Sequence, residues 1–445
     1  MTEEKSSQNQ DHLKDKPKHK DIVGEIFQKD IKKEKPSSLF DVSKSPLAHE
    51  ETAVANKSIV TSVPSANKAK PKSAIKWEMP RMFTAKSQKS FPFGIDIGDH
   101  SFKIVQLAKR ESGVEVSKLI LKEFPLEAIE KQQDSKTYLI KTLKETLKEN
   151  ELTHEAFCAL PSNKIQIKSL VFPKMPYKEI EGAIEWEIRQ MALGEAQGVS
   201  YDYVVLDEDK WGHQEKIEIL LLVSSKKDVL DYLALFESAG IKILAVDTES
   251  LSHLASLNYN QLFQNQEVAL VLDFGGSTSR LDIIKDRQLR FTRVLTTSGS
   301  TLTQAIKNYC HVSLEEAEKL KKSYGFANAQ DASSEKWQLV KNAINLLLEK
   351  LVMDIDHTFK YYSYQMTKST VTAFTKIVLS GGLAHLGILS SFLRDRLKVD
   401  IVVDDALKKI SIPPATSHGP SAYANEGVRF GIAFGLALRG INEKS

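Results

Sequence analysis

The stretch Phe93–Leu107, FGIDIGDHSFKIVQL, decides the fold. Apolar and polar residues alternate on both sides of a Gly-Asp turn, which is typical of a strand, a tight turn and a second strand. Asp96 falls at the end of the first strand, and Gly94 and Gly98 leave room for a ligand beside the backbone. A carboxylate next to small residues and free N–H groups suits a magnesium-bound polyphosphate, because the metal takes hard oxygen ligands and the phosphates take donors. Taken alone, the pattern also fits an ordinary hairpin.

A second stretch, Val268–Ile284, repeats this form as VALVLDFGGSTSRLDII, with Asp273 followed by Phe and then Gly275. Each copy continues with a charged turn, AKRESG or KDRQ, and a third alternating strand, VEVSKLILKEF or LRFTRVL. One β-meander therefore occurs twice, which predicts two similar half-domains. If their turns face each other, a nucleotide phosphate tail can be held between them.

Composition and charge narrow the function classes. The chain has 445 residues, enough for two to four domains. Residues 1–90 carry 18 Lys/Arg and 12 Asp/Glu, whereas the remainder carries 43 and 46, so the net charge of +3 is a property of the tail. The charge of residues 91–445 therefore does not indicate a nucleic-acid-binding surface. The chain has only two cysteines, which is typical of the reducing cytosol. Its N-terminus is charged and has no signal peptide, and no apolar run reaches about 20 residues. We therefore expect a soluble protein.

The tail, residues 1–90, is rich in Lys, Ser, Gln and Pro and poor in periodic apolar residues, so we expect it to be disordered. Two apolar islands interrupt it, DIVGEIFQKDIKK at 21–33 and AIKWEMPRMF at 74–83. They are either incidental hydrophobic residues in a linker or short motifs that fold on a partner. The sequence leaves both interpretations open.

Between the two meanders lies a separate β-α-β-β-α module. It consists of the strand NKIQIKSLVF, the amphipathic helix PYKEIEGAIEWEIRQMA, the strands YDYVVLD and KIEILLLVSS, and the helix KKDVLDYLALFESAG. It has no Gly-rich turn of its own, and Trp186 and Trp211 favour packing over base stacking. Beyond the second meander, Ser313–Gly325 predicts a capped helix, and Thr375–Leu389 predicts a strand, a Gly-Gly turn and a helix start.

Five motifs occur in order: GIDIGDHSFK, VLDFGGSTS, AEKLKKSYG, LSGGLAHLGIL and AFGLALRG. They resemble the two phosphate loops, the nucleotide-contacting helix, the adenosine loop and the closing helix of the actin-like ATPase superfamily. The resemblance covers residues 91–441. It is greatest to the PilM family of type IV pilus assembly proteins, through FTRVLTTSGSTLTQAI, VDTESLSHLASL and the position of the module, and next greatest to the FtsA family.

The resemblance implies an α/β, actin-like ATPase fold built from two duplicated half-domains with the inserted module, preceded by the disordered tail. The implied domains are the tail at 1–90, subdomain 1A at 91–162 with the closing helix at 425–441, the inserted subdomain 1C at 163–243, and the second half, subdomains 2A and 2B, at 244–424.

The resemblance also implies ATP and Mg²⁺ as cofactors. Asp96 and Asp273 would hold the metal, through water. The implied nucleotide-binding residues fall into groups: Asp96, Gly98, Ser101 and Lys103 in the first loop; Asp273, Gly275, Gly276 and Ser277 in the second; Glu318 and Lys321 along the ribose and base; and Gly381, Gly382 and Leu383 at the adenine. Alternation also allows Lys103 to be a surface lysine, and Glu318 and Lys321 also fit a solvated helix face.

Two residues depart from the pattern of the superfamily. Asp99 stands where relatives carry Ser or Thr, and its carboxylate either repels a terminal phosphate or binds a metal. Arg280 beside the second loop is uncommon, although alternation allows it to point away. The strand-end segment ALPSNK offers no Gln or Asp to orient an attacking water, so we assign no catalytic residue and expect at most slow ATP hydrolysis.

Three functions follow from the resemblance. The first is an ATP-binding scaffold at the cytoplasmic face of the inner membrane, which holds the N-terminal peptide of a PilN-like membrane protein in the cleft between the module and the first half. Pilus ATPases are further candidate partners, and the membrane is reached only through partners. The alternatives are an FtsA-like division filament and a small-molecule kinase, since fold does not determine function.

Overall fold

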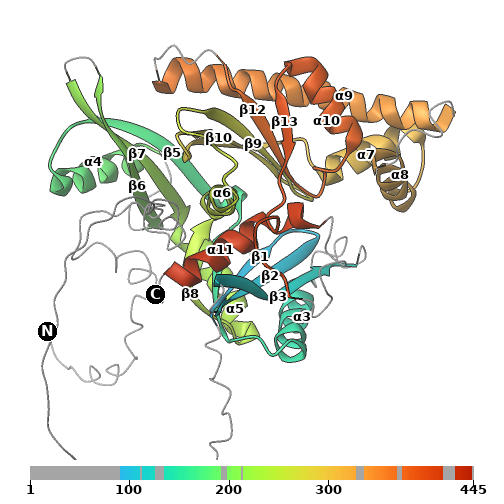
Figure 1. Cartoon of the computed structure of the whole chain (residues 1–445), viewed down its shortest axis with the longest axis horizontal. Coiled ribbons are helices and arrows are strands. Elements are labelled where there is room, and N and C mark those ends of the chain that lie inside the picture. The colour runs from blue at the N-terminus through green and yellow to red at the C-terminus, as the bar shows by residue number, and fades with distance from the viewer. Residues whose placement is uncertain are drawn as a thin grey trace, which may run out of the picture.

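The computed structural model describes residues 91–110, 113–125, 135–191, 198–211, 214–326, 335–367, 373–413 and 426–442. The predicted tail, residues 1–90, lies outside these ranges. The described residues form two five-stranded sheets and one three-stranded sheet. In Figure 1 the first sheet lies below, the second lies above it, and the third sheet extends from one side.

The first sheet contains the stretch Phe93–Leu107 in two of its strands. In spatial order its strands are β3 (Gly113–Glu123), β2 (Ser101–Arg110), β1 (Phe93–Ile97), β4 (Glu155–Leu160) and β8 (Lys242–Thr248). The strands β1, β2 and β3 form an antiparallel meander, as predicted, and β4 and β8 add to it in parallel.

Helices cover both faces of this sheet. Helices α3 (Ser135–Glu149) and α5 (Lys226–Ala239) cover one face, and α11 (Gly431–Asn442) covers the other. Alternation along β2 divides its side chains between the two faces, so Ile104 belongs to the core with α3 and α5, whereas Val105 belongs to the core with α11.

The second sheet repeats the first strand for strand. Its spatial order is β11 (Gln288–Leu295), β10 (Ser279–Lys285), β9 (Val268–Phe274), β12 (Lys376–Gly381) and β13 (Asp400–Val403). Three strands again form an antiparallel meander and two add in parallel. The predicted duplication is therefore confirmed.

The second sheet is also covered on both faces. One face packs against α7 (Gly299–Cys310), α8 (Leu314–Phe326), α9 (Glu335–Tyr361) and α10 (Gly387–Leu397). The other face packs against α6 (Glu249–Tyr259). A π-helical segment, Tyr362–Thr367, follows α9.

The inserted module contains the third sheet. Its strands are β5 (Ile165–Pro173), β7 (Gln214–Ser225) and β6 (Val199–Trp211), all antiparallel, and a 3₁₀ turn at Ser162–Lys164 leads into it. Helix α4 (Tyr177–Gln190) packs its buried isoleucines on β7. Trp186 does not pack as predicted, since 59% of it is exposed. The side chain of Trp211 lies outside the described ones.

The module ends earlier in the chain than the sequence indicated. The predicted boundaries placed α5 inside the module at 163–243 and most of β8 in the second half, from residue 244. In the structure Val229 and Phe236 of α5 lie in the core of the first half, and β8 pairs with β4 in the first sheet. A contiguous range cannot show this, because the chain leaves the first half at β4 and returns to it at α5.

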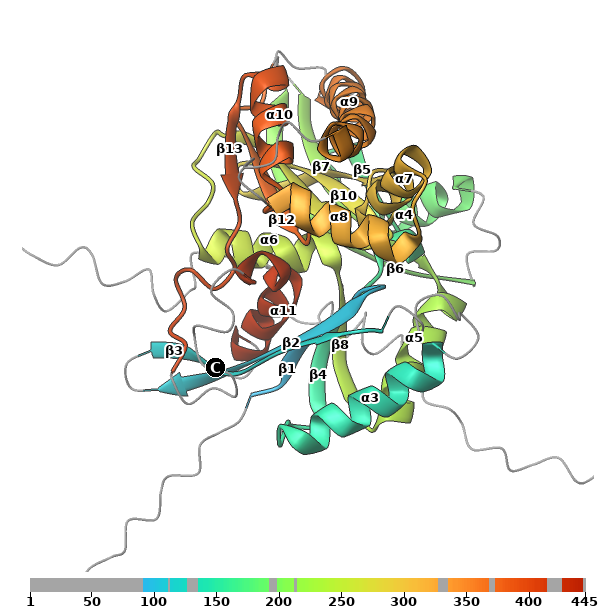
Figure 2. The ribbon, with the colours of Figure 1, turned by 90° about the vertical axis from the view of Figure 1, so that its right-hand side faces the viewer.

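Helices α6 and α11 join the two halves (Figure 2). Thr248 caps α6, accepting a hydrogen bond from Leu251 N at 3.1 Å. Gly435 brings α11 against α6, because a Cβ at this position would lie 1.7 Å from the Ser252 carbonyl oxygen. A 3₁₀ turn at Gly427–Arg429 precedes α11.

Candidate nucleotide site

The two Asp-Gly turns face each other. The first turn follows β1 and carries His100, and the second follows β9 and carries Gly276. A Cβ on Gly276 would lie 2.8 Å from Cγ of His100, so only glycine permits this approach. His100 Nε2 also lies 3.4 Å from Ser300 Oγ at the start of α7. The arrangement expected from the duplicated meander is therefore present.

Lys103 points into the site. It lies opposite Asp96 across β1 and β2, and its Nζ is 3.1 Å from Asp96 Oδ2. The side chains are 13% and 8% exposed, respectively, which rules out an ordinary surface lysine. Ser101 is also buried, and its Oγ accepts a hydrogen bond from Arg429 Nη2 at 3.3 Å. Asp99 is exposed.

Arg280 also points inward, which excludes the alternative that it points away from the second loop. It lies opposite Asp273 across β9 and β10, and its Nη2 donates to Asp273 Oδ2 at 3.1 Å. Its Nε donates to Asp282 Oδ2 at 2.9 Å. Its Nη1 donates to Glu249 Oε2 at 3.1 Å and to Ser162 Oγ at 3.4 Å. The side chain is 4% exposed.

Glu249 is a site residue that sequence reasoning missed. It begins α6, and its Oε2 accepts hydrogen bonds from the Ser162 backbone N at 3.0 Å and from Ser162 Oγ. Burial raises the pKa of Glu249, the charge of Arg280 lowers it, and the charges of Asp96 and Asp273 raise it. A third carboxylate therefore lies near both predicted metal ligands.

The carboxylate of Glu249 lies at a different strand end from the segment ALPSNK. That segment follows β4, whereas Glu249 follows β8 (Figure 2). Since β4 and β8 are parallel neighbours, their C-terminal ends meet at one edge of the sheet. The motif VDTES therefore carried a usable signal, namely a carboxylate directly after a predicted strand.

Glu318 and Lys321 form a buried link between α8 and α7. Lys321 Nζ lies 2.6 Å from Glu318 Oε2, and it donates to Thr303 Oγ1 at 2.9 Å and to the Gly299 carbonyl at 3.2 Å. Burial lowers the pKa of Lys321, and Glu318 raises it in part. The alternative of a solvated face is excluded for Lys321, which is 6% exposed.

The start of α7 lies directly over the second turn. The N–H groups of Gly299 and Ser300 donate to the carbonyls of Gly275 and Gly276 at 3.1 and 2.7 Å. Burial lowers the pKa of His100, and the charges of Lys321 and Lys103 lower it further. The charges of Asp99 and Glu318 raise this pKa, but the net shift is downward. Direct contacts therefore link the first loop, the second loop, the start of α7 and α8.

The Gly-Gly segment after β12 adjoins the second loop. Gly381 has a positive φ of 78°, and a Cβ there would lie 2.6 Å from Asp273 Oδ1. Gly382 N donates to the Phe274 carbonyl at 3.0 Å. Ser277 is exposed at the tip of the loop, whereas Leu383 is 5% exposed and its side chain belongs to the core of the second half.

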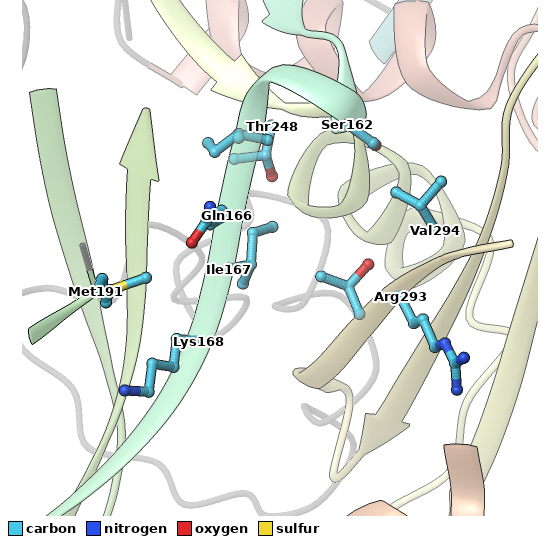
Figure 3. Close-up of a pocket in the computed structure, with 10 residues that line it drawn as sticks. Ser162, Gln166, Ile167, Lys168, Met191, Thr248, Arg293 and Val294 are labelled. Carbon is cyan, nitrogen blue, oxygen red and sulfur yellow. The ribbon is translucent and has the colours of Figure 1, made fainter. Parts of the chain in front are cut away.

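A separate cavity of about 330 Å³ lies beside the inserted module. Gln166, Ile167 and Lys168 of β5 line one wall, and Arg293 and Val294 of β11 line the opposite wall (Figure 3). Ser162 and Thr248 lie at one end, and Met191 lies on the module side. The cavity borders the module, and its opposite wall belongs to the second half, whereas the predicted peptide cleft lies between the module and the first half.

The described ranges contain neither a metal-binding cluster of side chains nor a candidate membrane-spanning helix. No group of three or more His, Cys, Asp or Glu side chains among those residues is arranged to hold a metal ion. None of their helices is both long enough and apolar enough to cross a membrane.

Two duplicated half-domains whose Asp-Gly turns face each other define the class of protein: the chain has an actin-like ATPase fold. A family described as type IV pilus assembly protein PilM matches residues 94–441. The chain therefore belongs to the PilM family of type IV pilus assembly proteins.

The chain is also similar to individual proteins, to differing extents. A solved structure of a PilM–PilN type IV pilus biogenesis complex has a TM-score of 0.63 at 23% identity, over 79% of this chain and 98% of that chain, and so shares the fold. The cell division protein FtsA of Bacillus subtilis (strain 168) is 31% identical over 125 residues, which span 28% of each protein. MreB 5 of Spiroplasma citri bound to AMPPNP has a TM-score of 0.43 at 12% identity, over 80% of this chain and 98% of that chain.

Proposed function

We propose that this protein is an ATP-binding scaffold of the type IV pilus assembly platform, which binds the N-terminal peptide of a PilN-like inner-membrane protein. The observation that carries the nucleotide half of the proposal is the approach of His100 to Gly276, which brings the two Asp-Gly turns against each other. Family membership and the PilM–PilN neighbour support the other half. The proposed location is the cytoplasmic face of the inner membrane, and pilus ATPases are further candidate partners.

In the proposed complex the phosphates lie between the two turns. Backbone N–H groups around Gly98, Gly275 and Gly276 and the ammonium of Lys103 would bind phosphate oxygens. The adenosine would lie toward Gly381 and Gly382, with Glu318 and Lys321 supporting the start of α7. The contacts that link the two turns, the start of α7, α8 and the Gly-Gly segment support this placement.

Mg²⁺ fits the donors of this site. Asp96 and Asp273 supply hard carboxylate oxygens, and Mg²⁺ commonly takes one or two carboxylates, with water and substrate phosphates completing its shell. The carboxylates of Asp96, Glu249, Asp273 and Asp282 outnumber the two cations Lys103 and Arg280. A divalent cation would balance the remaining negative charge and neutralise phosphate oxygens as they enter.

The nucleotide half is tested by ATP titration of the full chain. We expect Asp96→Ala and Asp273→Ala each to weaken binding of ATP with Mg²⁺ at least tenfold, about 1.4 kcal/mol. The control is Asp395→Ala, which removes an exposed carboxylate on α10 and should leave affinity unchanged. Equal affinity in the wild type and in both site variants, with native melting temperatures, would refute the two-loop site.

The cavity between β5 and β11 suits an extended peptide. Both are edge strands of their sheets, so each has one side without a neighbouring strand among the described residues. They meet where Ser169 Oγ donates to the Arg290 carbonyl, and the cavity lies farther along both strands. A peptide can add to such an edge by backbone hydrogen bonds, while Ile167 and Val294 receive its apolar side chains.

The peptide half is tested with a synthetic N-terminal peptide of the cognate PilN-like protein. We expect Val294→Glu, in the cavity wall, to weaken binding about tenfold, because it places a charged side chain where an apolar side chain of the peptide would pack. The matched control is Val171→Glu on β5, which lies outside the cavity lining but is similarly exposed, at 46% against 42%. Equal effects of the two variants would exclude the cavity as the peptide site.

The position of Glu249 favours slow ATP hydrolysis as a second candidate activity. Its carboxylate lies within electrostatic range of Asp96 and Asp273, where a terminal phosphate would be held. Its Oε2 is already engaged by Ser162 and Arg280, which limits its capacity to accept a proton from water.

A further inference from the structure

The inserted module and the segment before Phe91 carry opposite charges. Residues 57–90 contain 8 Lys/Arg and 1 Asp/Glu, a net charge of +7, and they end where the described structure begins. Residues 163–225, which contain β5, α4, β6 and β7, hold 7 Lys/Arg and 11 Asp/Glu, a net charge of −4. Since residues 91–445 carry −3 as a whole, the module accounts for all of their net negative charge. Electrostatic attraction therefore draws the segment toward the module.

Helix α4 presents carboxylates and an indole ring on its outer side, which we call the α4 face: Glu179, Glu181, Glu185 and Trp186. The three glutamates are exposed, and 59% of Trp186 is exposed, although tryptophan usually packs. Burial raises the pKa of Tyr201 on β6, and the charges of Glu185 and Glu181 raise it further, so these glutamates lie near an aromatic ring. Tryptophan is enriched among the residues that contribute most to binding between proteins. The α4 face therefore has the composition of a docking surface for a basic, partly apolar segment.

The second apolar island of the tail has the complementary chemistry. It lies inside the basic segment, at residues 74–83, and has the sequence AIKWEMPRMF. Its lysine and arginine can pair with carboxylates and lie over an indole ring. Its methionines and aromatic residues make favourable contacts with aromatic rings. The island therefore matches the α4 face in charge and in apolar character.

The length of chain before the first half allows the island to reach the module. Phe93 of β1 pairs with Ala156 of β4, six residues before Ser162, where the chain enters the module. Six residues of strand span about 20 Å. Fully extended, the chain from Trp77 to Phe91 spans about 50 Å. The island can therefore reach α4 without any displacement of the described elements.

We propose that residues 74–83 dock on the α4 face of the same chain, with Trp186 as the apolar contact and the glutamates as partners of Lys76 and Arg81. The island is then a binding motif and not a linker, and its partner is the module. Because the segment is tethered, its effective concentration is about millimolar, so a weak contact is sufficient. Any other protein that binds the α4 face must displace the island. This inference depends on neither the nucleotide nor the PilN-like peptide.

The first experiment measures trypsin cleavage of the full chain. The rate of cleavage after Lys76 and Arg81 is divided by the rate after Lys32 in the other island, so that each chain supplies its own reference. We expect Trp186→Ala, and separately the double variant Glu181→Lys with Glu185→Lys, to raise this ratio at least about threefold, because cleavage follows the population of the undocked segment.

Matched controls change the same residue types elsewhere on the surface. Leu346→Ala removes an apolar side chain of α9 that is 69% exposed, and Glu145→Lys with Glu149→Lys reverses two exposed carboxylates of α3. Both controls should leave the ratio unchanged. An unchanged ratio in Trp186→Ala or in the α4 double variant would overturn the proposal, and so would a rise of equal size in either control.

The second experiment joins lysine amines to carboxylates in contact with them, using a zero-length carbodiimide reagent. An equal mixture of unlabelled and isotope-labelled full chain is treated, and the linked peptides are identified by mass spectrometry. We expect Lys76 or Lys86 to be linked to Glu181 or Glu185 within one chain. Links predominantly to Glu145 on α3, or links only between labelled and unlabelled chains, would overturn the proposal.

The third experiment separates the module from an anionic membrane, which also attracts basic segments. Trypsin cleavage of the wild type and Trp186→Ala is repeated with vesicles of phosphatidylcholine and phosphatidylglycerol, and with vesicles of phosphatidylcholine alone. Slower cleavage of the wild type than of Trp186→Ala in the absence of vesicles supports docking on α4. Equal ratios in the two proteins without vesicles, with protection of both only by the anionic vesicles, would assign the island to the membrane and overturn the proposal.

Discussion

His253 and Asp404 form a buried pair at the junction of the halves. His253 lies on α6, Asp404 follows β13, and Nε2 to Oδ2 measures 3.2 Å, with side-chain exposures of 1% and 0%. Burial lowers the pKa of His253, but the hydrogen bond to Asp404 and the charges of Asp273 and Asp404 outweigh burial, and the net shift is upward from 6.5. Arg280 opposes this rise.

This pair predicts a pH dependence of stability. A histidine whose folded pKa is raised stabilises the fold fully below its unfolded pKa, and this contribution is lost as pH rises through the folded pKa. From pH 6.5 upward, the free energy of unfolding of the wild type should therefore fall relative to that of His253→Gln. Denaturant titrations at several pH values would check this, and parallel pH profiles for the two proteins would contradict it.

At the scale of the element, the contact between α6 and α11 decides how the halves are joined. Gly435 of α11 lies against the Ser252 carbonyl of α6, and Gly94 of β1 lies against the Ala433 carbonyl on another side of α11. The same helix therefore packs on both halves. Its sequence, rich in small and apolar residues, indicated close packing but not the partner.

Gly435→Ala should destabilise the protein by about 1–3 kcal/mol, because its Cβ would meet the Ser252 carbonyl at 1.7 Å and backbone must move. The control is Gly182→Ala on α4, where no atom lies within 4 Å of the new Cβ. That change should stabilise by about 0.5–1 kcal/mol, since alanine favours a helix over glycine. Equal unfolding free energies for Gly435→Ala and the wild type would show that the two helices are not tightly packed.

At the scale of the whole molecule, the two candidate sites share a residue. Ser162 hydrogen-bonds Glu249 and Arg280 at the nucleotide site and also lines the cavity beside β5. The walls of that cavity belong to the module and to the second half, so any change in the angle between the halves changes its width. This geometry would link the proposed nucleotide site to the proposed peptide site.

We therefore expect ATP to change the affinity for the PilN-like peptide by about fivefold or more, and the peptide to change ATP affinity by the same factor, since coupling between two sites is reciprocal. Isothermal titrations of each ligand with and without the other would measure both factors. The Val294→Glu variant, with its cavity impaired, provides the control. Peptide affinities that are identical with and without ATP would mean that the two sites are independent.

Much of the fold follows from local patterns. Strand alternation, the repeated Asp-Gly turn and the helix signals predicted both meanders, the module's strands and the order of the motifs, because each depends on residues near one another in the chain. The same patterns located Asp96, Gly276 and Gly381 at strand ends. The structure places Gly276 against His100 of the first turn and Gly381 against Asp273.

Only the tertiary structure decided the contacts between residues that are far apart in the sequence. The sequence by itself determined the duplication and both acidic turns, since these repeat within short windows. It could not determine that Arg280 points inward, that Glu249 lies beside Asp273, or that α5 and β8 return to the first half. The physical reason is that side-chain pairing across parallel strands depends on which strand ends share an edge, and that order is set only when separate segments pack into one sheet.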